Sequence, residues 1–301
     1  MSQARGRTSS ERPDFLASGG DALTPLERAQ IRFMSRSFEP GKLDSALRWC
    51  QRTIGARWID YFTRNLRHVH GIERLPPLEA DKSFLCVSNH RSFFDLYVVS
   101  AVLVRRGLPH RLIFPVRSNF FYDTPLGFVV NGIMSFFAMY PPVFRAKGGD
   151  GTRARDAKRV ALNLVGVEEI VWMLRRGGVW VGIHPEGTRK KDADAYTLLP
   201  AQTGVGRIIH RSRVQVIPVF VNGLINDLRT QVTGNVTRKG PPIVVVFGSP
   251  VDFSPLLDTS GSPRTYRSIA ERALEAVAAL GQEERSIRAS LPATSPSRAE
   301  A

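Results

Sequence analysis

The residues of this chain best suited to proton transfer are a histidine and an aspartate five positions apart, His90 and Asp95. They belong to the segment Asn-His-Arg-Ser-Phe-Phe-Asp, which follows an apolar run and opens a predicted helix. In that arrangement the carboxylate can accept a hydrogen bond from one ring nitrogen, and the other nitrogen is free as a general base toward a hydroxyl. Asp95 could equally serve only the backbone, because Ser92-x-x-Asp95 resembles a helix capping box.

A second polar segment, residues 182–189, reads Gly-Ile-His-Pro-Glu-Gly-Thr-Arg and also follows an apolar run. Gly187 allows the backbone to approach a ligand closely, and Thr188 and Arg189 offer a hydroxyl and a forked cation to a phosphate. Glu186 could hold the hydroxyl groups of a substrate or brace the arginine. The alternative is a plain β-turn, for which Pro-Glu-Gly-Thr is a good sequence.

The elements that must position these segments alternate between strands and helices. Alternation of this kind predicts an α/β fold with a central, mostly parallel or mixed sheet flanked by helices. Both polar segments follow predicted strands, so their side chains should meet at the carboxyl edge of the sheet. We expect strands at 83–88, 111–116, 179–183, 214–221 and 243–247, and helices at about 93–106, 153–176 and 264–280.

Residues 43–67 predict an N-terminal helix with one apolar and one basic face. Such a helix could lie at a membrane surface, or it could dock on the domain with its basic face in water. The predicted organisation is a flexible segment 1–40, a folded domain 41–285 with its catalytic core at about 69–250, and a flexible tail 286–301.

The composition favours anionic partners. Among 301 residues, 42 lysines and arginines stand against 27 aspartates and glutamates, a net charge of +15. Nucleic acid, phosphorylated metabolites and an anionic membrane all fit this excess, but the aromatic residues do not interleave with the basic ones as in nucleic-acid binding. Cys50 and Cys86 suggest neither a disulfide framework nor a zinc site. No secretory signal is recognised, so a cytoplasmic location is expected.

Four segments occur in an order that resembles the glycerolipid acyltransferase family, which includes the 1-acyl-glycerol-3-phosphate acyltransferases. They are Asn-His-x4-Asp at 89–95, Pro-Val-Phe-Arg at 142–145, Pro-Glu-Gly-Thr-Arg at 185–189 and Val-Ile-Pro-Val at 216–219. The resemblance covers about residues 69–250. It implies that His90 is the base and Asp95 its orienting partner. It further implies that a glycerol phosphate head is bound by Arg145, Glu186, Gly187, Thr188 and Arg189, that Asn89 and Ser92 brace the turn, and that Pro218 supports the acyl side.

The implied reaction is acyl transfer from acyl-CoA or acyl-carrier protein to a glycerophosphate-type acceptor, most simply 1-acyl-glycerol-3-phosphate. No bound cofactor or metal is implied, and the partners are a membrane lipid surface, the lysophospholipid and the thioester donor. The enzyme would be peripheral or monotopic at the cytoplasmic side of a membrane. His184 stands where the family usually has phenylalanine, and this departure leaves another lysophospholipid or a non-glycerol acceptor open.

The segment 126–144 carries no formal charge and is long enough for a transmembrane helix. A single crossing would place His90 and Glu186 on opposite sides of the bilayer, so we expect it to be core, re-entrant or lipid-facing. Two rival functions remain from the residues alone. One is a metal-dependent hydrolase with His90, Asp95, His184 and Glu186 as ligands, and the other is a non-catalytic membrane-binding module.

Overall fold

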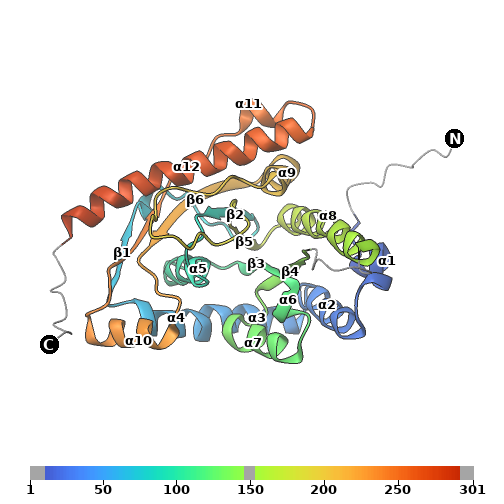
Figure 1. The fold of residues 1–301 in the computed structure, drawn as a ribbon, viewed down its shortest axis with the longest axis horizontal. Helices are drawn as coiled ribbons and strands as arrows, with labels where there is room; N and C mark the ends of the chain where they lie inside the picture. The colour runs from blue at the N-terminus through green and yellow to red at the C-terminus, as the bar shows by residue number, and fades with distance from the viewer. Residues whose placement is uncertain (1–10, 146–152, 292–301) are drawn as a thin grey trace.

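A computed structural model describes residues 11–145 and 153–291 of the chain. Its centre is a seven-stranded sheet with the strand order β1-β7-β6-β2-β5-β3-β4 (Figure 1). Neighbouring strands run parallel except β6 and β7, which are antiparallel. The predicted α/β class with a mixed sheet is therefore confirmed. The strands are β1 (Arg67–His70), β2 (Phe84–Ser88), β3 (Arg111–Arg117), β4 (Met139–Val143), β5 (Val179–Ile183), β6 (Gln215–Asn222) and β7 (Ile243–Phe247).

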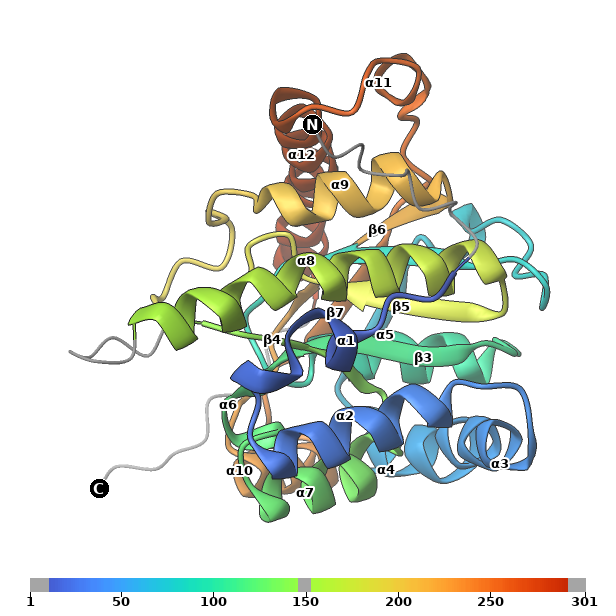
Figure 2. The same ribbon diagram turned by 90° about the vertical axis from the view of Figure 1, so that its right-hand side faces the viewer.

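Helices cover both faces of the sheet (Figures 1 and 2). One face carries α8 (Arg153–Arg176), α9 (Thr203–Ser212) and α12 (Pro263–Ser290), with the short α11 (Ser254–Leu257) beside α12. The other face carries α5 (Asp95–Arg105). Beyond α5 lies an outer row of helices: α2 (Pro25–Ser37), α3 (Lys42–Cys50), α4 (Ala56–Thr63), α7 (Pro125–Ser135) and α10 (Leu228–Thr237).

The central strands are uninterrupted apolar runs because both of their faces are covered. Every residue of β2 and of β7 is buried. The two strands that the pattern did not predict, β1 and β4, form the two edges of the sheet. The first is Arg-His-Val-His, and the second contains Pro141 and Pro142, which are tolerated at an edge where one side of the ladder is free.

The prediction of a flexible segment 1–40 is wrong for residues 11–40. Here α1 (Phe15–Gly19), the 3-10 turn η1 (Gly20–Ala22) and α2 pack on the domain, and Phe15, Ile31 and Met34 are buried. A capping box formed by Thr24 and Glu27 starts α2. Residues 1–10 lie outside the described part of the chain.

The C-terminal boundary also needs correction. The predicted helix 264–280 is α12, which continues to Ser290, and Arg288 bonds to Glu284 one turn before it within this added part. Val277, Leu280 and Gly281 are buried against the sheet, and the buried Glu284 accepts a hydrogen bond from Tyr196. Of the predicted tail 286–301, residues 286–290 are helical, and 292–301 lie outside the described part.

The predicted helix 43–67 consists of α3, a π-helical turn η2 (Gln51–Gly55) and α4. It ends at Thr63, and the last predicted residue, Arg67, begins β1. The run is docked, because the Gln51 side chain accepts from Leu112 N at 2.9 Å. Docking does not exclude a surface role, since Trp49 and Tyr61 are exposed by 60% and 62%.

The uncharged segment 126–144 forms most of α7 and then β4. In the turn between them, the carbonyls of Phe136 and Phe137 accept hydrogen bonds from Arg111. Together with α6 (Ser118–Phe121) the segment folds back onto the domain rather than continuing in one direction. Over the described residues, every helix is too short or too polar to cross a bilayer. The remaining short element is the 3-10 turn η3 (Ile72–Arg74).

Candidate active site

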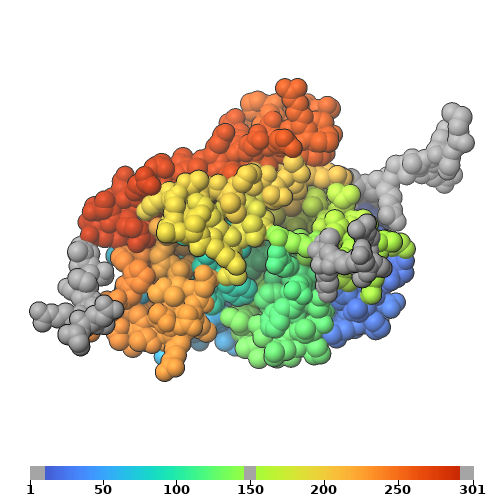
Figure 3. All heavy atoms as spheres, viewed as in Figure 1, coloured from blue at the N-terminus to red at the C-terminus, as the bar shows by residue number. Residues whose placement is uncertain are grey.

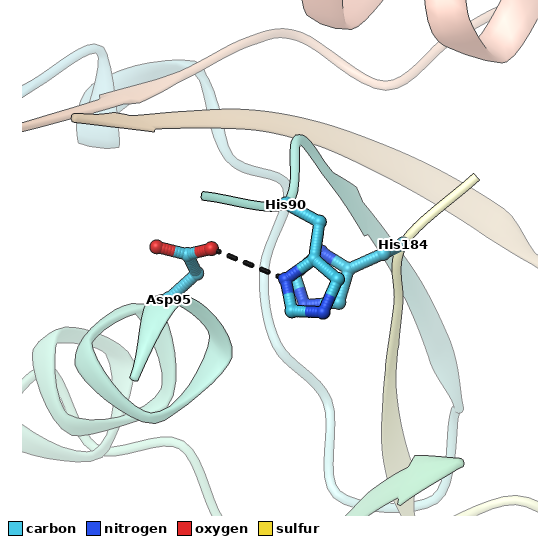
Figure 4. Close-up of side chains that lie close together, drawn as sticks. All are labelled: His90, Asp95 and His184. Atoms are coloured by element: carbon cyan, nitrogen blue, oxygen red, sulfur yellow. Dashed lines mark hydrogen bonds and ion pairs between the residues drawn. The ribbon is translucent and has the colours of Figure 1, made fainter. Parts of the chain in front are cut away.

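The two polar segments of the sequence meet because the strands that carry them are neighbours. Strands β2 and β5 pair in parallel, with Val87 opposite Ile183. The residues that follow both strands therefore leave the sheet at the same edge. The His90 and His184 rings are stacked there, with centroids 3.7 Å apart and planes inclined by 7°. Figure 4 shows this stack, with Asp95 reaching it from the first turn of α5.

The side chains of His90 and Asp95, the expected dyad, lie next to each other. His90 Nδ1 lies 3.4 Å from Asp95 Oδ2, and this carboxylate is 1% exposed. The same oxygen accepts from the backbone N–H groups of Arg91 and Ser92, both at 2.8 Å. Asp95 therefore contacts the backbone turn and the imidazole together, while the Ser92 hydroxyl accepts from Phe94 N and does not complete a capping box with Asp95. Because Nδ1 faces the aspartate, Nε2 is the ring nitrogen available to a substrate.

Burial sets the protonation states of the pair. It lowers the pKa of His90 to about 3, and the nearby Arg189 guanidinium acts in the same direction. Burial raises the pKa of Asp95 to about 6, against the effect of His184 and of the backbone N–H donors. At neutral pH the site therefore holds a neutral imidazole beside a carboxylate, which is the state a general base requires.

Glu186 holds the loop of the base. Its Oε1 accepts from the His90 backbone N–H at 2.7 Å, and its Oε2 accepts from the Leu199 N–H at 2.8 Å. The side chain is 2% exposed. Since both oxygens are directed at backbone amides, this geometry supports a bracing role and does not support the expected contact with hydroxyl groups of an acceptor.

Two bracing residues of the first segment are placed as expected. The Asn89 amide spans to β6, where its Nδ2 donates to Val221 O and its Oδ1 accepts from Val221 N. The Ser92 hydroxyl donates to Asn226 Oδ1 at 3.2 Å. Pro218 lies within β6 opposite Val87 and is buried in the sheet, so it acts on the site through the strand.

A cationic cavity of about 390 Å³ lies next to the loop of His90; Arg91 lines it, whereas His90 and Asp95 do not. Arg189 enters it, with Nη1 bonded to Asn226 Oδ1 at 3.1 Å, and the exposed Lys191 lines it. Arg91 and Lys190 also line it but already bind the loop of Asp192 and Asp194. In Figure 3 the teal part of the chain, near residue 100, lies at the bottom of a depression between yellow, orange and green segments.

Arg145 approaches the same turn from the end of β4. Its Nη2 donates to the Gly187 carbonyl at 2.9 Å. Gly187 has φ +65°, a conformation that favours glycine, and a Cβ there would meet Gln202 Cγ at 2.9 Å. Thr188 and Arg189 are exposed beside it. The structure therefore brings the expected phosphate-binding residues around one turn next to His90.

His90, Asp95 and His184 also form a group whose possible metal-binding atoms lie within 4.8 Å of one another. An imidazole binds a metal in the plane of its ring. Two parallel rings 3.7 Å apart have no common point in both planes, so the histidines would have to rotate to share an ion. Glu186, the fourth residue of the metal-hydrolase interpretation, faces backbone amides instead.

The site lies inside a recognisable family domain. The model of the family described as Acyltransferase matches residues 66–222, more than half of the chain, and this range includes the dyad, Glu186 and Arg189. The chain therefore belongs to the acyltransferase family, and it is an enzyme of acyl transfer. A solved structure that it resembles is the 1-acyl-sn-glycerophosphate (LPA) acyltransferase PlsC from Thermotoga maritima. The two share 20% sequence identity with a TM-score of 0.48, over 86% of this chain and 95% of that one.

The sequence pattern missed Asn226. Its Oδ1 accepts from Ser92 Oγ, Phe93 N and Arg189 Nη1, so it joins the turn of the base to the cationic cavity. It lies in a loop four residues after the end of β6, where the local pattern gives no signal. The stacking of His184 on His90 likewise could not be predicted from the spacing of residues in the sequence.

Proposed function

We propose that this enzyme transfers a fatty acyl group from an acyl thioester to a hydroxyl of a glycerophosphate-type acceptor, converting 1-acyl-glycerol-3-phosphate to phosphatidic acid. The observation that carries the proposal is the position of the base. A neutral imidazole beside Asp95 belongs to the residue next to Arg91, and Arg91 lines a cavity together with Arg189 and Lys191. A hydroxyl close to a phosphate can be held there with its proton toward His90 Nε2.

In the proposed reaction the acceptor oxygen attacks the thioester carbon while His90 Nε2 takes the hydroxyl proton. The carbon–sulfur bond then breaks, the new ester forms, and the thiolate leaves with the proton from His90. Asp95 stabilises the transient imidazolium through Nδ1. Because the acceptor itself is the nucleophile, no acyl-enzyme intermediate is required.

The acceptor phosphate is assigned to the turn of residues 187–189. Arg189 offers a forked donor, Lys191 adds a point charge, and Arg145 lies on the other side of Gly187. The Arg189 guanidinium also lowers the pKa of His90. A phosphate bound there would offset that charge.

We further propose that the outer helices bind a lipid surface. A groove of about 550 Å³ between α4 and α10 opens on this side and is lined mainly by apolar residues. The exposed Arg52 in η2, Arg57 in α4 and Arg64 at the end of α4 would meet anionic head groups. The exposed apolar residues are Leu43, Trp49, Ile54 and Tyr61 on the α3–α4 run, Leu126, Val129 and Ile133 on α7, and Leu228 and Val236 on α10.

The test is an assay of thiol release with long-chain acyl-CoA and lysophosphatidic acid, together with detection of phosphatidic acid. His90→Ala should abolish turnover, and Arg189→Ala should mainly raise the KM for the acceptor. Full activity of a folded His90→Ala protein would disprove the assigned base. A panel of other lysophospholipids and of acyl-carrier protein as donor identifies the preferred substrates. Loss of activity with a chelator, restored by metal, would instead favour metal-dependent chemistry.

A further inference from the structure

The strongest unassigned feature of the site is the ring that covers one face of the base. The last pair between β2 and β5 is Val87 and Ile183. Ser88 and His184 are the next residues of the two strands' chains. The Nδ1 of His184 lies 3.0 Å from the Ser88 carbonyl oxygen. A carbonyl can only accept, so Nδ1 carries a proton and donates to it. This bond fixes the plane of the His184 ring, and that plane lies parallel to His90 at 3.7 Å.

His90 needs such a support because its own polar contact is weak. The Nδ1–Oδ2 separation is 3.4 Å, while the same carboxylate oxygen makes two bonds of 2.8 Å to backbone N–H groups. A bond of that length restrains the imidazole poorly. Packing against a fixed ring restrains rotation out of the plane, which is the motion that would carry Nε2 away from a substrate.

We infer that His184 is a positioning residue that holds the imidazole of His90 in the plane in which Nδ1 faces Asp95 and Nε2 faces the acceptor. The assignment of the acceptor side rests on the proposed acyl transfer. The supporting ring is itself tethered, because its hydrogen bond to Ser88 ties the end of β5 to the strand that carries the base. Phenylalanine at this position could stack but could not make that bond.

Other charged groups around the base do not replace this contact. His90 faces Asp95 of α5 and the charge of Arg189 in the loop after β5. Its backbone N–H donates to Glu186. The two polar contacts lie at the edge of the ring or at the main chain. His184 alone among these groups lies on the ring face (Figure 4).

The first test compares His184→Ala and His184→Phe in the acyl-transfer assay. Removal of the ring should lower kcat by about 10- to 100-fold with little change in KM for either substrate, because a misplaced base costs rate and not binding. Phenylalanine should restore part of the lost kcat through stacking alone. The control is His110→Ala, which removes a fully buried histidine near the start of β3 that bonds to the Glu79 and Lys82 carbonyls. It should lower thermal stability and leave kcat within about twofold.

The second test does not depend on the reaction. In protein labelled with ¹⁵N-histidine, the six histidines can be titrated by NMR, with the signal of His90 assigned from a His90→Gln variant. In His184→Ala, water reaches the exposed ring face, so His90 should take up its proton at least about one pH unit higher than in the unsubstituted protein. His184→Phe and His110→Ala should leave that titration nearly in place.

Wild-type kcat and an unchanged His90 titration in His184→Ala would overturn the inference. So would equal losses of kcat in His184→Ala and His110→Ala, because these would indicate a general loss of stability. If the unsubstituted protein showed no acyl transfer while the titration of His90 moved as expected, the proposed function would fail and the positioning contact would stand.

Discussion

The backbone N–H of His90 donates to Oε1 of Glu186 at 2.7 Å, across 96 positions of the sequence. One oxygen of this carboxylate thus fixes the main chain of His90, and its other oxygen fixes that of Leu199. The sheet brings the two segments together, and Glu186 sets their final separation.

Glu186→Gln should therefore destabilise the protein and reduce turnover. One of the two buried N–H groups, of His90 or Leu199, would face an amide NH₂ and lose its acceptor, which costs about 1–3 kcal/mol. Denaturant unfolding measures the loss. The matched control is Glu283→Gln, which weakens a surface pair with Arg74 and should change stability by less than about 0.5 kcal/mol. Equal effects of the two substitutions would contradict the bracing role.

The two roles of Asp95 can be separated by substitution. Asp95→Asn keeps an oxygen for the N–H groups of Arg91 and Ser92, and its NH₂ can occupy the place of Oδ1, which makes no hydrogen bond within the described structure. Stability should stay near that of the unsubstituted protein while kcat falls about 10²- to 10⁴-fold, because the imidazolium loses its counter-charge. Asp95→Ala should lose stability as well, by about 1 kcal/mol. Near-normal kcat in the asparagine variant would rule out the dyad.

Acid should destabilise the site through its histidines. Burial lowers the pKa of His90 and of His184 to about 3, so below the ordinary histidine value of about 6.5 the unfolded chain binds more protons than the folded one. Their contribution to stability is complete above that value and declines as the pH falls toward 3. Asp95, with its raised pKa, acts in the opposite direction but is present in every variant compared.

Replacing one of these histidines isolates its contribution to the pH dependence of stability. Between pH 7.5 and pH 5, the free energy of unfolding of His184→Phe should fall less than that of the unsubstituted protein, by about 1–2 kcal/mol. Urea unfolding at the two pH values measures this difference. If the free energy of unfolding fell equally in the two proteins, the pKa of His184 would not be lowered in the folded state.

The outer helices should govern binding to lipid. Ile133→Asp places a charge on α7 at a side chain that is 69% exposed, so folding should be little affected while vesicle binding weakens. Leu164→Asp on α8 is the control, because Leu164 is 55% exposed on a helix of the other layer. Co-sedimentation with phosphatidylglycerol vesicles distinguishes them. Equal binding by both variants would place the lipid surface elsewhere.

The sequence predicted those parts of the molecule that depend on local pattern. The strands Val179–Ile183 and Ile243–Phe247 and the helix Arg153–Arg176 have the expected bounds, since continuous apolar runs and a Gly-Gly stop specify them. Edge strand β4 escaped prediction because its two prolines are unusual in a sheet. The early residues were assigned to a flexible segment although the cap of α2 at Thr24 and Glu27 could be read from the sequence.

For the site, residue types predicted the dyad but not its supports. Spacing indicates that His90 and Asp95 can meet, whereas the direction of the Glu186 carboxylate depends on the position of Leu199. The contacts of Asn226 and His184 likewise arise from the register of neighbouring strands and loops. The Ser92–Asn226 and Ser88–His184 contacts join residues 134 and 96 positions apart, and local sequence carries no signal for them.

The position of β2 in the strand order has a consequence for the synthesis of the chain. Both of its partners, β5 and β6, lie more than 90 residues downstream, so the first apolar strand of the core leaves the ribosome with two open edges. Unpaired apolar strands readily associate with other chains, and loop closure over such distances slows folding. We therefore expect nascent chains that end before residue 222 to aggregate or to bind chaperones, and the solubility of the newly made protein to depend on how quickly its second half follows.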